Sequence, residues 1–331
     1  MQSFKALLID EVDGKVSSAF ATLDEARLDP GTVTIRVAYS SVNYKDALAA
    51  TGAGKIIRRF PCIGGIDLSG TVIESADPRF APGDPVIATS FDIGVAHHGG
   101  YSEIARVAGD WVVPLPAGLS LFDAMALGTA GFTAALAVVR MEENRLAPVN
   151  GPVIVTGATG GVGSLAVDIL ADRGYHVVAL TGKASEADYL RGLGAAEVML
   201  RGSLDLAKIR PLDKARWAGA VDNLGGDILA WIASTMAQGG TIASIGLAAS
   251  MNLNTTVAPF ILRGVSLLGI DSGYIREPYR SGVWQRLASD LRPPHLSGMS
   301  RRIGFAELPA TFNEYIAGRA KGRVVVEIGG E

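Results

Sequence analysis

The sequence predicts a two-domain α/β protein, with a β-rich domain and a doubly wound, parallel-sheet domain. At 331 residues, the chain is longer than one hydrophobic core usually supports. Its first 125 or so residues contain short β-type runs separated by turn-forming sequences, such as Asp-Pro-Gly at 29–31 and Pro-Gly-Asp at 82–84. The strands expected in this part are residues 5–9, 33–37, 70–73, 85–88, 101–107 and 111–113.

Strands and helices alternate after residue 151, and this pattern predicts the parallel sheet. Parallel strands require crossover connections, which place helices on both faces of the sheet. The expected strands are 153–156, 176–180, 197–200, 220–222, 241–245 and 267–270. The expected helices are 162–173, 185–193, 228–236 and 259–263. Six strands are enough for a complete dinucleotide-binding Rossmann fold.

Two stretches join these domains. Ala-rich helical sequence begins at Leu121, so we expect a domain boundary near Gly128. The last stretch, 278–331, is expected to return to the first domain with helices at 283–291 and 308–317 and a strand at 324–328. The predicted domains are therefore 1–127 with 272–331, and 128–271.

Composition excludes several classes of function. A net charge of −3 gives no overall footprint for nucleic acid. The single cysteine, Cys62, rules out a disulfide framework or a cysteine-rich zinc site and agrees with a reducing compartment. No signal-peptide pattern and no long uninterrupted apolar run is present, so the sequence predicts a soluble, cytoplasmic enzyme.

The strongest local motif is an apolar strand followed at once by a glycine-rich turn. Val153–Thr156 leads into Gly-Ala-Thr-Gly-Gly-Val-Gly at 157–163, and a helical pattern follows. This arrangement aims backbone N–H groups and a positive helix end at a pyrophosphate. Ala158 departs from the usual Gly-x-Gly-x-x-Gly pattern, and a tight strand-to-helix turn without ligand remains the alternative. The expected contacts are Thr159, Gly160, Gly161, Val162 and Gly163.

The end of the second strand favours NADPH over NADH. Thr181, Gly182 and Lys183 stand where NAD-binding proteins usually carry an acidic residue for the ribose hydroxyl. A threonine hydroxyl and a lysine can bind a 2′-phosphate, and Arg201 after the third strand offers a second cation. The alternative is that Lys183 and Arg201 are solvated surface charges.

Eight blocks of sequence, spread over essentially the whole chain, are shared with a known family. They are SVNYKDAL (41–48), GGIDLSGTV (64–72), PGDPV (82–86), GTAGFTA (128–134), the glycine-rich turn, WAGAVD (217–222), TTVAPFILR (255–263) and GR (322–323). On these blocks the chain resembles the zinc-independent, quinone-oxidoreductase-like branch of the medium-chain dehydrogenase/reductases. Within that branch it is similar to the acrylyl-CoA reductase family.

The resemblance implies a GroES-like catalytic domain built from both chain ends, a Rossmann domain between them, and a cleft where nicotinamide meets substrate. It further implies NADPH-dependent reduction of acrylyl-CoA to propionyl-CoA and a homodimer. Zinc-dependent cousins bind catalytic metal through a cysteine and a His-Glu pair, and here Ile66 and Asp67 take the place of that pair. His97 and His98 are adjacent and would face opposite sides of a strand, so no metal site is expected.

Reduction of an enoyl thioester needs hydride at Cβ, stabilisation of the enolate and a proton at Cα. Asn43 and Tyr44 are the best candidate donors, with turn capping and pocket lining as their structural alternatives. Arg323 could hold the substrate carbonyl or a CoA phosphate, or form a structural ion pair. Asp46 and Asp67 are expected to shape the site through hydrogen bonds. From the resemblance, Tyr44, Leu247, Ile261 and Ser272 would contact the cofactor.

Three functions stay open on the sequence alone. The first is an acrylyl-CoA reductase, and the second is a reductase of quinones or free 2-alkenals with the same cofactor site. The third is an NADPH-binding protein without turnover, which the intact glycines of the turn disfavour. Sequence defines the hydride donor far better than the acceptor. Arg58 and Arg59 belong to a basic run that could meet CoA phosphates or lie in a solvated loop.

Overall fold

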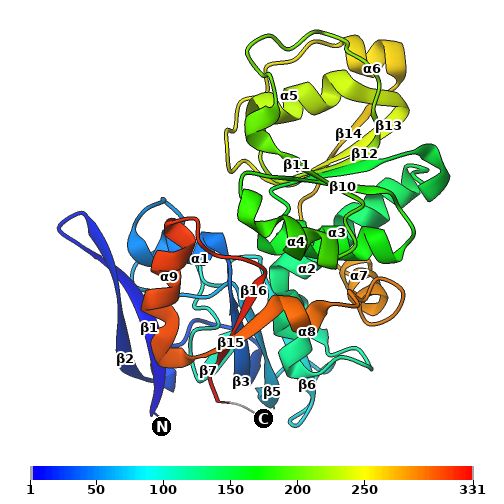
Figure 1. Cartoon of the computed structure of the whole chain (residues 1–331). Coiled ribbons are helices and arrows are strands. Elements are labelled where there is room, and N and C mark those ends of the chain that lie inside the picture. Colours follow the sequence, from blue (N-terminus) through cyan, green and yellow to red (C-terminus); the bar gives the residue numbers. More distant parts are fainter. Residues whose placement is uncertain (1–2, 330–331) are drawn as a thin grey trace. The chain divides into compact units, whose positions relative to one another are not determined.

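The structure is a computed structural model that describes residues 3–329, and its chain forms two compact units (Figure 1). The first unit contains the chain up to Thr129, Gly273–Ala288, and the chain from Leu296 on. The second unit contains Ala130–Ser272 and Ser289–His295. Both ends of the chain therefore belong to the β-rich unit, and each unit is described by itself below.

The first unit is built on two sheets. A three-stranded sheet has the order β2-β1-β4, and a larger sheet has the order β15-β16-β3-β5-β6-β8, with β7 pairing to β3. The strands are β1 (Ser3–Val12), β2 (Lys15–Asp24), β3 (Val33–Val42), β4 (Cys62–Ile63), β5 (Asp67–Ser75), β6 (Pro85–Thr89), β7 (Ile104–Val107), β8 (Val112–Pro114), β15 (Ser300–Gly304) and β16 (Arg323–Glu327). The helices are α1 (Tyr44–Thr51), α7 (Tyr279–Leu287), α8 (Leu296–Met299) and α9 (Leu308–Ile316).

Alternation along the strands builds the cores of this unit. Val33, Ile35 and Val37 of β3 have the two-residue period of a strand face, and they pack in one buried cluster with Leu68 and Val72 of β5. A second buried cluster joins apolar residues of β1, α1, α9 and β16. The second cluster anchors α1 and β16 in the core of this unit.

The second unit is a six-stranded, entirely parallel sheet with the order β11-β10-β9-β12-β13-β14. This is the strand order of a Rossmann fold, and it confirms the predicted fold class. Its strands are β9 (Val153–Thr156), β10 (Val177–Thr181), β11 (Glu197–Leu200), β12 (Trp217–Asp222), β13 (Met236–Ser244) and β14 (Ser266–Gly269). Its helices are α3 (Gly161–Asp172), α4 (Ala187–Gly192), α5 (Gly226–Thr235) and α6 (Ala258–Arg263). Helices α3 and α4 lie on one side of this sheet and α5 on the other (Figure 1).

Short 3-10 turns supplement these elements. They are η1 (Glu25–Arg27), η2 (Gly109–Trp111), η3 (Pro148–Asn150), η4 (Ala184–Glu186), η5 (Arg201–Ser203) and η6 (Phe305–Glu307).

Helix α2 (Leu121–Glu143) is long, apolar and interrupted. Gly128 has φ 51° and ψ −155°, which is not helical and divides α2 into two halves. Among residues 3–329 this is the one helix long and apolar enough to cross a membrane, but 83% of its apolar window is buried inside the protein. Such burial is what a core helix of a globular enzyme shows.

Several elements differ from the sequence prediction. Strands β2 and β15 and helix α1 were not expected, because β2 has no fully buried face and α1 has only eight residues. Helix α7 begins and ends four residues before the predicted helix at 283–291. These are short or partly exposed elements, for which hydrophobic periodicity is a weak signal.

One segment lies in a different unit from the predicted one. Ser289–His295 groups with the second unit, whereas the prediction assigned all of 272–331 to the first. The reason is a set of polar contacts to α3 and its end. The N–H and Nδ1 of His295 bond to the carboxylate of buried Asp168 at 2.9 and 2.7 Å, and Arg173 Nη1 pairs with Asp290 at 3.1 Å.

Candidate functional site

The glycine-rich turn joins β9 to α3 in the second unit. Gly157 has φ +58°, a conformation that favours glycine. A Cβ on Gly163 would lie 2.3 Å from the carbonyl oxygen of Gly157, so α3 can start this close to the turn only with glycine there. Ala158, at the departure from the usual pattern, is fully buried, which suits a small side chain, and its N–H donates to Leu180 O of β10 at 3.2 Å.

The start of α3 presents backbone donors. The first helical hydrogen bond runs from Ser164 N to Gly160 O, so the N–H groups of Gly161, Val162 and Gly163 have no acceptor within the helix. The N–H of Gly160 donates to Gly157 O at 2.9 Å and is therefore used by the turn itself. A helix start of this kind fits the pyrophosphate of a dinucleotide. The helix geometry points the N–H groups of three predicted contacts, Gly161, Val162 and Gly163, out of the amino end of α3.

Buried polar groups tie the carboxyl ends of the central strands together. Thr156 Oγ1 donates to Asp222 Oδ1 at 2.8 Å, and Asn223 Nδ2 donates to Thr156 O at 2.7 Å. Burial raises the pKa of Asp222, and its hydrogen bonds to Thr156 and to the Gly225 N–H act in the opposite direction. Asp222 and Asn223 thus tie the end of β12 to the end of β9, directly before the glycine-rich turn. Neither residue is a predicted site residue, although an Asp-Asn pair at the end of a buried strand is a signal of such a role.

The residues predicted to select NADPH lie together at the end of β10. Thr181 ends this strand, and its hydroxyl accepts the N–H of Lys183 at 3.0 Å. A Cβ on Gly182 would lie 3.6 Å from Nη2 of Arg201, so the Arg201 guanidinium lies beside the Gly182 backbone. The cluster thus combines a hydroxyl with two cations, the chemistry expected for a 2′-phosphate.

The resemblance implies cofactor contacts from Leu247, Ile261 and Ser272, and these residues do not all lie at the same edge of the parallel sheet. Leu247 follows β13 and its Cα lies next to Gly225, at the carboxyl edge of the sheet. Ser272 follows β14 at that same edge, where its hydroxyl accepts a hydrogen bond from Thr133 Oγ1 at 2.6 Å.

Ile261 lies on α6, near the amino edge. Arg263 of this helix donates to the carbonyl oxygens of Ser234 and Met236, at the amino end of β13. A crossover must carry the chain from the carboxyl end of β13 to the amino end of β14, and α6 belongs to that crossover. The structure therefore brings Leu247 and Ser272, but not Ile261, to the edge that carries the glycine-rich turn.

In the first unit, Asn43 precedes helix α1 and is its N-cap. The Asn43 N–H donates to Asp46 Oδ2 at 2.9 Å. Its Nδ2 donates to Asp67 Oδ2 at 2.8 Å and to Asp46 Oδ2 at 3.1 Å, while its Oδ1 accepts from Arg323 Nη1 at 3.2 Å. The side-chain amide is engaged with protein groups, and the Asp46 carboxylate accepts the Asn43 N–H at the start of α1, so the geometry favours the structural alternative for Asn43. Tyr44, the first residue of α1, is 51% exposed.

Arg323, the first residue of β16, is buried. Its side chain is 1% exposed and donates to four acceptors: Ala126 O, Val42 O, Asn43 Oδ1 and Ser41 Oγ. Contact with a substrate carbonyl or a CoA phosphate would require a guanidinium that reaches the surface, and the structure turns this one inward. The geometry therefore favours a structural role for Arg323 over the predicted substrate contact.

Two buried carboxylates stand beside these groups. Burial raises the pKa of Asp46 to about 7, and the negative charge of Asp67 adds to this effect. Hydrogen bonds from Asn43 and from the Ile66 N–H act against it. The phenols of Tyr101 and Tyr315 donate to Ser41 O and Val42 O, and burial raises the pKa of both.

The remaining sequence candidates are the possible metal ligands and the basic run with Arg58 and Arg59. Within residues 3–329, no three or more His, Cys, Asp or Glu side chains group so that they could hold a metal ion. Burial raises the pKa of the Cys62 thiol to about 12. Arg58 pairs with Asp92 and Arg59 with Asp29, so both arginines of the basic run have acidic partners.

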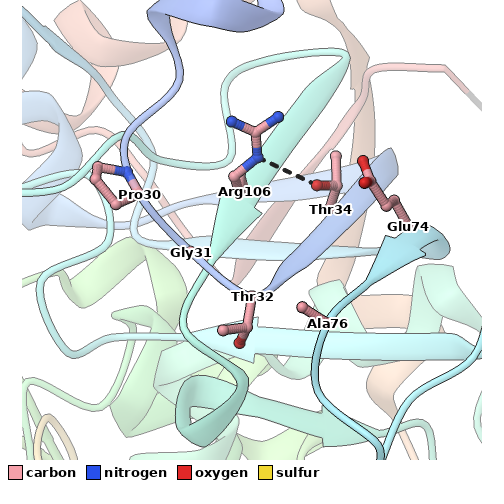
Figure 2. Close-up of a pocket in the computed structure, with 7 residues that line it drawn as sticks. All are labelled: Pro30, Gly31, Thr32, Thr34, Glu74, Ala76 and Arg106. Carbon is pink, nitrogen blue, oxygen red and sulfur yellow. Dashed lines mark hydrogen bonds between the residues drawn. The ribbon is translucent and has the colours of Figure 1, made fainter.

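The first unit also carries a shallow hollow (Figure 2). Its volume is about 260 Å³. It is lined by Pro30, Gly31, Thr32, Thr34, Glu74, Ala76 and Arg106, and none of the predicted site residues borders it. Arg106 bonds weakly to Thr34 there, at 3.3 Å.

Comparisons with known proteins agree with this architecture. Residues 29–117 match the family model described as the alcohol dehydrogenase GroES-like domain, and residues 161–289 match the zinc-binding dehydrogenase model. The fold and its glycine-rich turn define a medium-chain dehydrogenase/reductase.

Curated relatives match almost from end to end. Acrylyl-CoA reductase AcuI of Ruegeria pomeroyi is 47% identical over 98% of this chain and 99% of its own length. A putative quinone oxidoreductase of Bacillus subtilis, YhfP, is 49% identical over 98% of this chain and 99% of its own length. The chain belongs to the acrylyl-CoA reductase family, within the quinone-oxidoreductase-like branch of this superfamily.

Two solved structures carry nicotinamide cofactors. Escherichia coli YhdH with bound NADPH superposes with a TM-score of 0.95 at 47% identity, covering 98% of this chain and 100% of that one. B. subtilis yhfP with bound NAD superposes with a TM-score of 0.96 at 49% identity, covering 99% and 100%.

Proposed function

We propose that this protein reduces the 2,3 double bond of acrylyl-CoA to give propionyl-CoA, with NADPH as the reductant. The 47% identity with the Ruegeria acrylyl-CoA reductase, over 98% of this chain, supports this choice of substrate. The quinone oxidoreductase name of the Bacillus relative favours a second candidate, reduction of a quinone or a free 2-alkenal. Both candidates need the same hydride donor and differ in the acceptor alone.

The residues of the second unit support NADPH as the cofactor. The amides of Gly161, Val162 and Gly163 would hold the pyrophosphate, and the cations of Lys183 and Arg201 would hold the 2′-phosphate. Relatives with bound NADPH and with bound NAD both exist, so these two cations are the feature that favours NADPH here. When bound, the nicotinamide supplies the hydride that adds to Cβ of the substrate.

Within the first unit, Tyr44 is the proposed proton donor to Cα. Its phenol is the one predicted catalytic group with a side chain half exposed, and a phenol can act as a general acid. Asn43 and Arg323 are engaged with protein groups, so their proposed role is to hold Tyr44 in place. No metal is needed, because the enolate can be stabilised by hydrogen bonds.

The test is a spectrophotometric assay of NADPH oxidation with acrylyl-CoA, acrolein and a quinone as alternative acceptors. We expect the highest kcat/KM for acrylyl-CoA and no change when a chelator is added. A preference for the quinone would replace the proposed function with the second candidate. Loss of activity with the chelator would contradict a metal-free reaction.

We also propose that the protein is a homodimer. Strand β14 lies at one edge of the parallel sheet, and no strand of the described part of the chain pairs with its outer side. Leu267 on this strand is partly exposed. Light scattering of the purified protein should give about twice the 34.4 kDa mass of one chain.

A further inference from the structure

Asp67 and Arg323 form the centre of a buried polar network in the first unit. Asp67 is fully buried at the start of β5, and Arg323 is buried at the start of β16. Arg323 Nη2 donates to Ser41 Oγ at 2.9 Å, and Ser41 Oγ donates to Asp67 Oδ2 at 2.6 Å. The two opposite charges are thus linked through one hydroxyl, and their attraction offsets part of the cost of removing them from water.

These two charged residues bond to helix α2 on either side of its break at Gly128. At the end of the first half of α2, the carbonyl oxygen of Ala126 accepts a hydrogen bond from Arg323 Nε at 2.9 Å. The second half begins with the N–H of Thr129, which donates to Asp67 Oδ1 and Oδ2 at 3.1 and 3.0 Å. A cation at a helix carboxyl end and an anion at a helix amino end each match the partial charge of that end. Asp67 and Arg323 therefore cap the two ends that the break creates.

Gly128 lies between the two caps and leaves them room. A Cβ there would lie 2.7 Å from Asp67 Oδ2, 2.8 Å from Arg323 Nη2 and 3.0 Å from Ser41 Oγ. Its positive φ is also one that side chains rarely adopt. The close approach of the helix to the network thus depends on glycine at this position.

The same network holds the residue before Tyr44. Asp67 accepts from Asn43 Nδ2, and Arg323 donates to Asn43 Oδ1. Asn43 is the N-cap of α1 and directly precedes Tyr44, so holding the Asn43 side chain also holds the backbone from which Tyr44 is presented. One carboxylate is consequently bonded both to the start of α1 and to the second half of α2.

We infer that Asp67 is a positioning residue of the reductase: its carboxylate, held by Arg323 through Ser41, couples the placement of Tyr44 to the break in α2 at Gly128. The inference rests on the proposed function, because Tyr44 is the proton donor in that reaction. Asp67 acts through other residues and takes no part in proton transfer.

Replacement of Asp67 by asparagine tests this role with little change in shape. Donors face both carboxylate oxygens: Thr129 at Oδ1, and Ser41 and Asn43 at Oδ2. An asparagine side chain offers one acceptor oxygen, so its NH₂ group must face a donor on one side. The variant also leaves the charge of Arg323 without its anion.

The experiment is a double-mutant cycle of Asp67→Asn with Tyr44→Phe, read as kcat for acrylyl-CoA and as the Kd of NADPH. Asp67→Asn alone should lower kcat by about 10-fold or more and change the NADPH Kd by less than about 2-fold. In the Tyr44→Phe background, Asp67→Asn should lower kcat by less than about 2-fold, because the group that it positions is already gone. A structural role without positioning would lower kcat by the same factor in both backgrounds.

Asp29→Asn is the matched control. Asp29 is a buried carboxylate of the same unit and pairs with an arginine, Arg59, but its contacts are with His98 and Arg59. This variant should leave kcat unchanged within about 2-fold. A loss of kcat in Asp29→Asn equal to that in Asp67→Asn would show a general effect of removing a buried charge and would overturn the inference.

Two further variants keep the test valid if Asp67→Asn does not fold. Ser41→Ala removes only the hydroxyl between the two charges and should lower kcat with the same dependence on Tyr44. Gly128→Ala should lower kcat as well, whereas Gly318→Ala, with a similar φ of +67° and nothing within 4 Å, should not. Wild-type kcat in folded Ser41→Ala and Gly128→Ala would overturn the inference.

The outcomes separate the inference from the proposed function. An active wild-type enzyme with additive effects in the cycle retains the proposed function and overturns the positioning role. A wild-type enzyme that reduces only the quinone or the 2-alkenal overturns the proposed substrate, and the cycle run with that acceptor still decides the role of Asp67. A wild-type enzyme that oxidises NADPH with none of the three acceptors overturns both.

Discussion

The glycine-rich turn of the second unit and the Asp67 network of the first unit use polar groups in opposite ways. At the turn, the first-turn amides of α3 have no acceptor within the helix, and the helix start carries a partial positive charge. In the network, the hydrogen-bonding groups of Asn43, Asp67 and Arg323 are bonded to other protein groups.

The difference teaches how to tell a binding surface from a framework. A site that receives a ligand keeps its donors available until the ligand arrives, because a donor already bonded would have to give up that bond. A network that holds a catalytic group in place fills its own hydrogen bonds, because an unpaired buried polar group costs about 1–3 kcal/mol. On this criterion Arg323 and Asn43 belong to the framework, and Tyr44 and the α3 amides fit the proposed roles of proton donor and pyrophosphate contact.

The largest effect, on the Kd of NADPH, is expected from a substitution in the glycine-rich turn. Gly163→Ala would place a Cβ 2.3 Å from Gly157 O, so α3 must move away from the turn. The NADPH Kd should rise by about 100-fold or more, which corresponds to about 2.7 kcal/mol. Fluorescence titration with NADPH measures this. Gly192→Ala is the control, since nothing lies within 4 Å of its Cβ; an equal loss there would remove the turn as the cause.

The next effect concerns the working group of the first unit. Tyr44→Phe removes the phenol and keeps the ring, so kcat should fall by about 100-fold while the NADPH Kd stays nearly constant. Steady-state kinetics with acrylyl-CoA, together with the same titration, separates the two quantities. Unchanged turnover would show that another group or water delivers the proton, and Tyr44 would then be a lining residue.

A smaller and more selective effect is expected at the end of β10. Arg201→Ala and Lys183→Ala should each weaken NADPH binding by about 10-fold and leave NADH binding nearly constant, because only the 2′-phosphate meets these cations. Arg191→Ala is the control, since Arg191 is exposed on α4 and pairs with Asp188. A parallel loss for both cofactors would indicate damage to the fold.

The smallest effect concerns stability and pH. Because the pKa of Asp46 is raised to about 7, the folded protein keeps a proton there that the unfolded chain releases near pH 4. The contribution of the Asp46 carboxyl group to the free energy of unfolding is therefore fully present below about pH 4 and is lost as pH rises towards 7. Asp46→Asn cannot titrate, so the difference in unfolding free energy between wild type and variant should change over that range and be constant above it. Urea unfolding at pH 5, 6 and 8 measures this, and a constant difference throughout would contradict the raised pKa.

The sequence predicted the second unit closely and the first unit only in part. Strands β9 and β11 begin and end where they were predicted. For β9 the reason is that a buried parallel strand is a short, continuous apolar run. Helix α1 was missed, although it carries Tyr44. Its eight residues begin with a polar capping group and have a weak apolar face, so the family resemblance alone pointed to that position.

The sequence by itself determined the strand, glycine-rich turn and helix of the proposed cofactor site, because these lie within a few residues of one another and depend on local backbone conformation. Only the tertiary structure decided the roles of Asn43, Asp67 and Arg323. Arg323 meets Ala126 and Ser41 across separations of 197 and 282 residues. No spacing in the sequence encodes such contacts, because they arise when β3, β5, β16 and α2 pack together and bury the same polar groups.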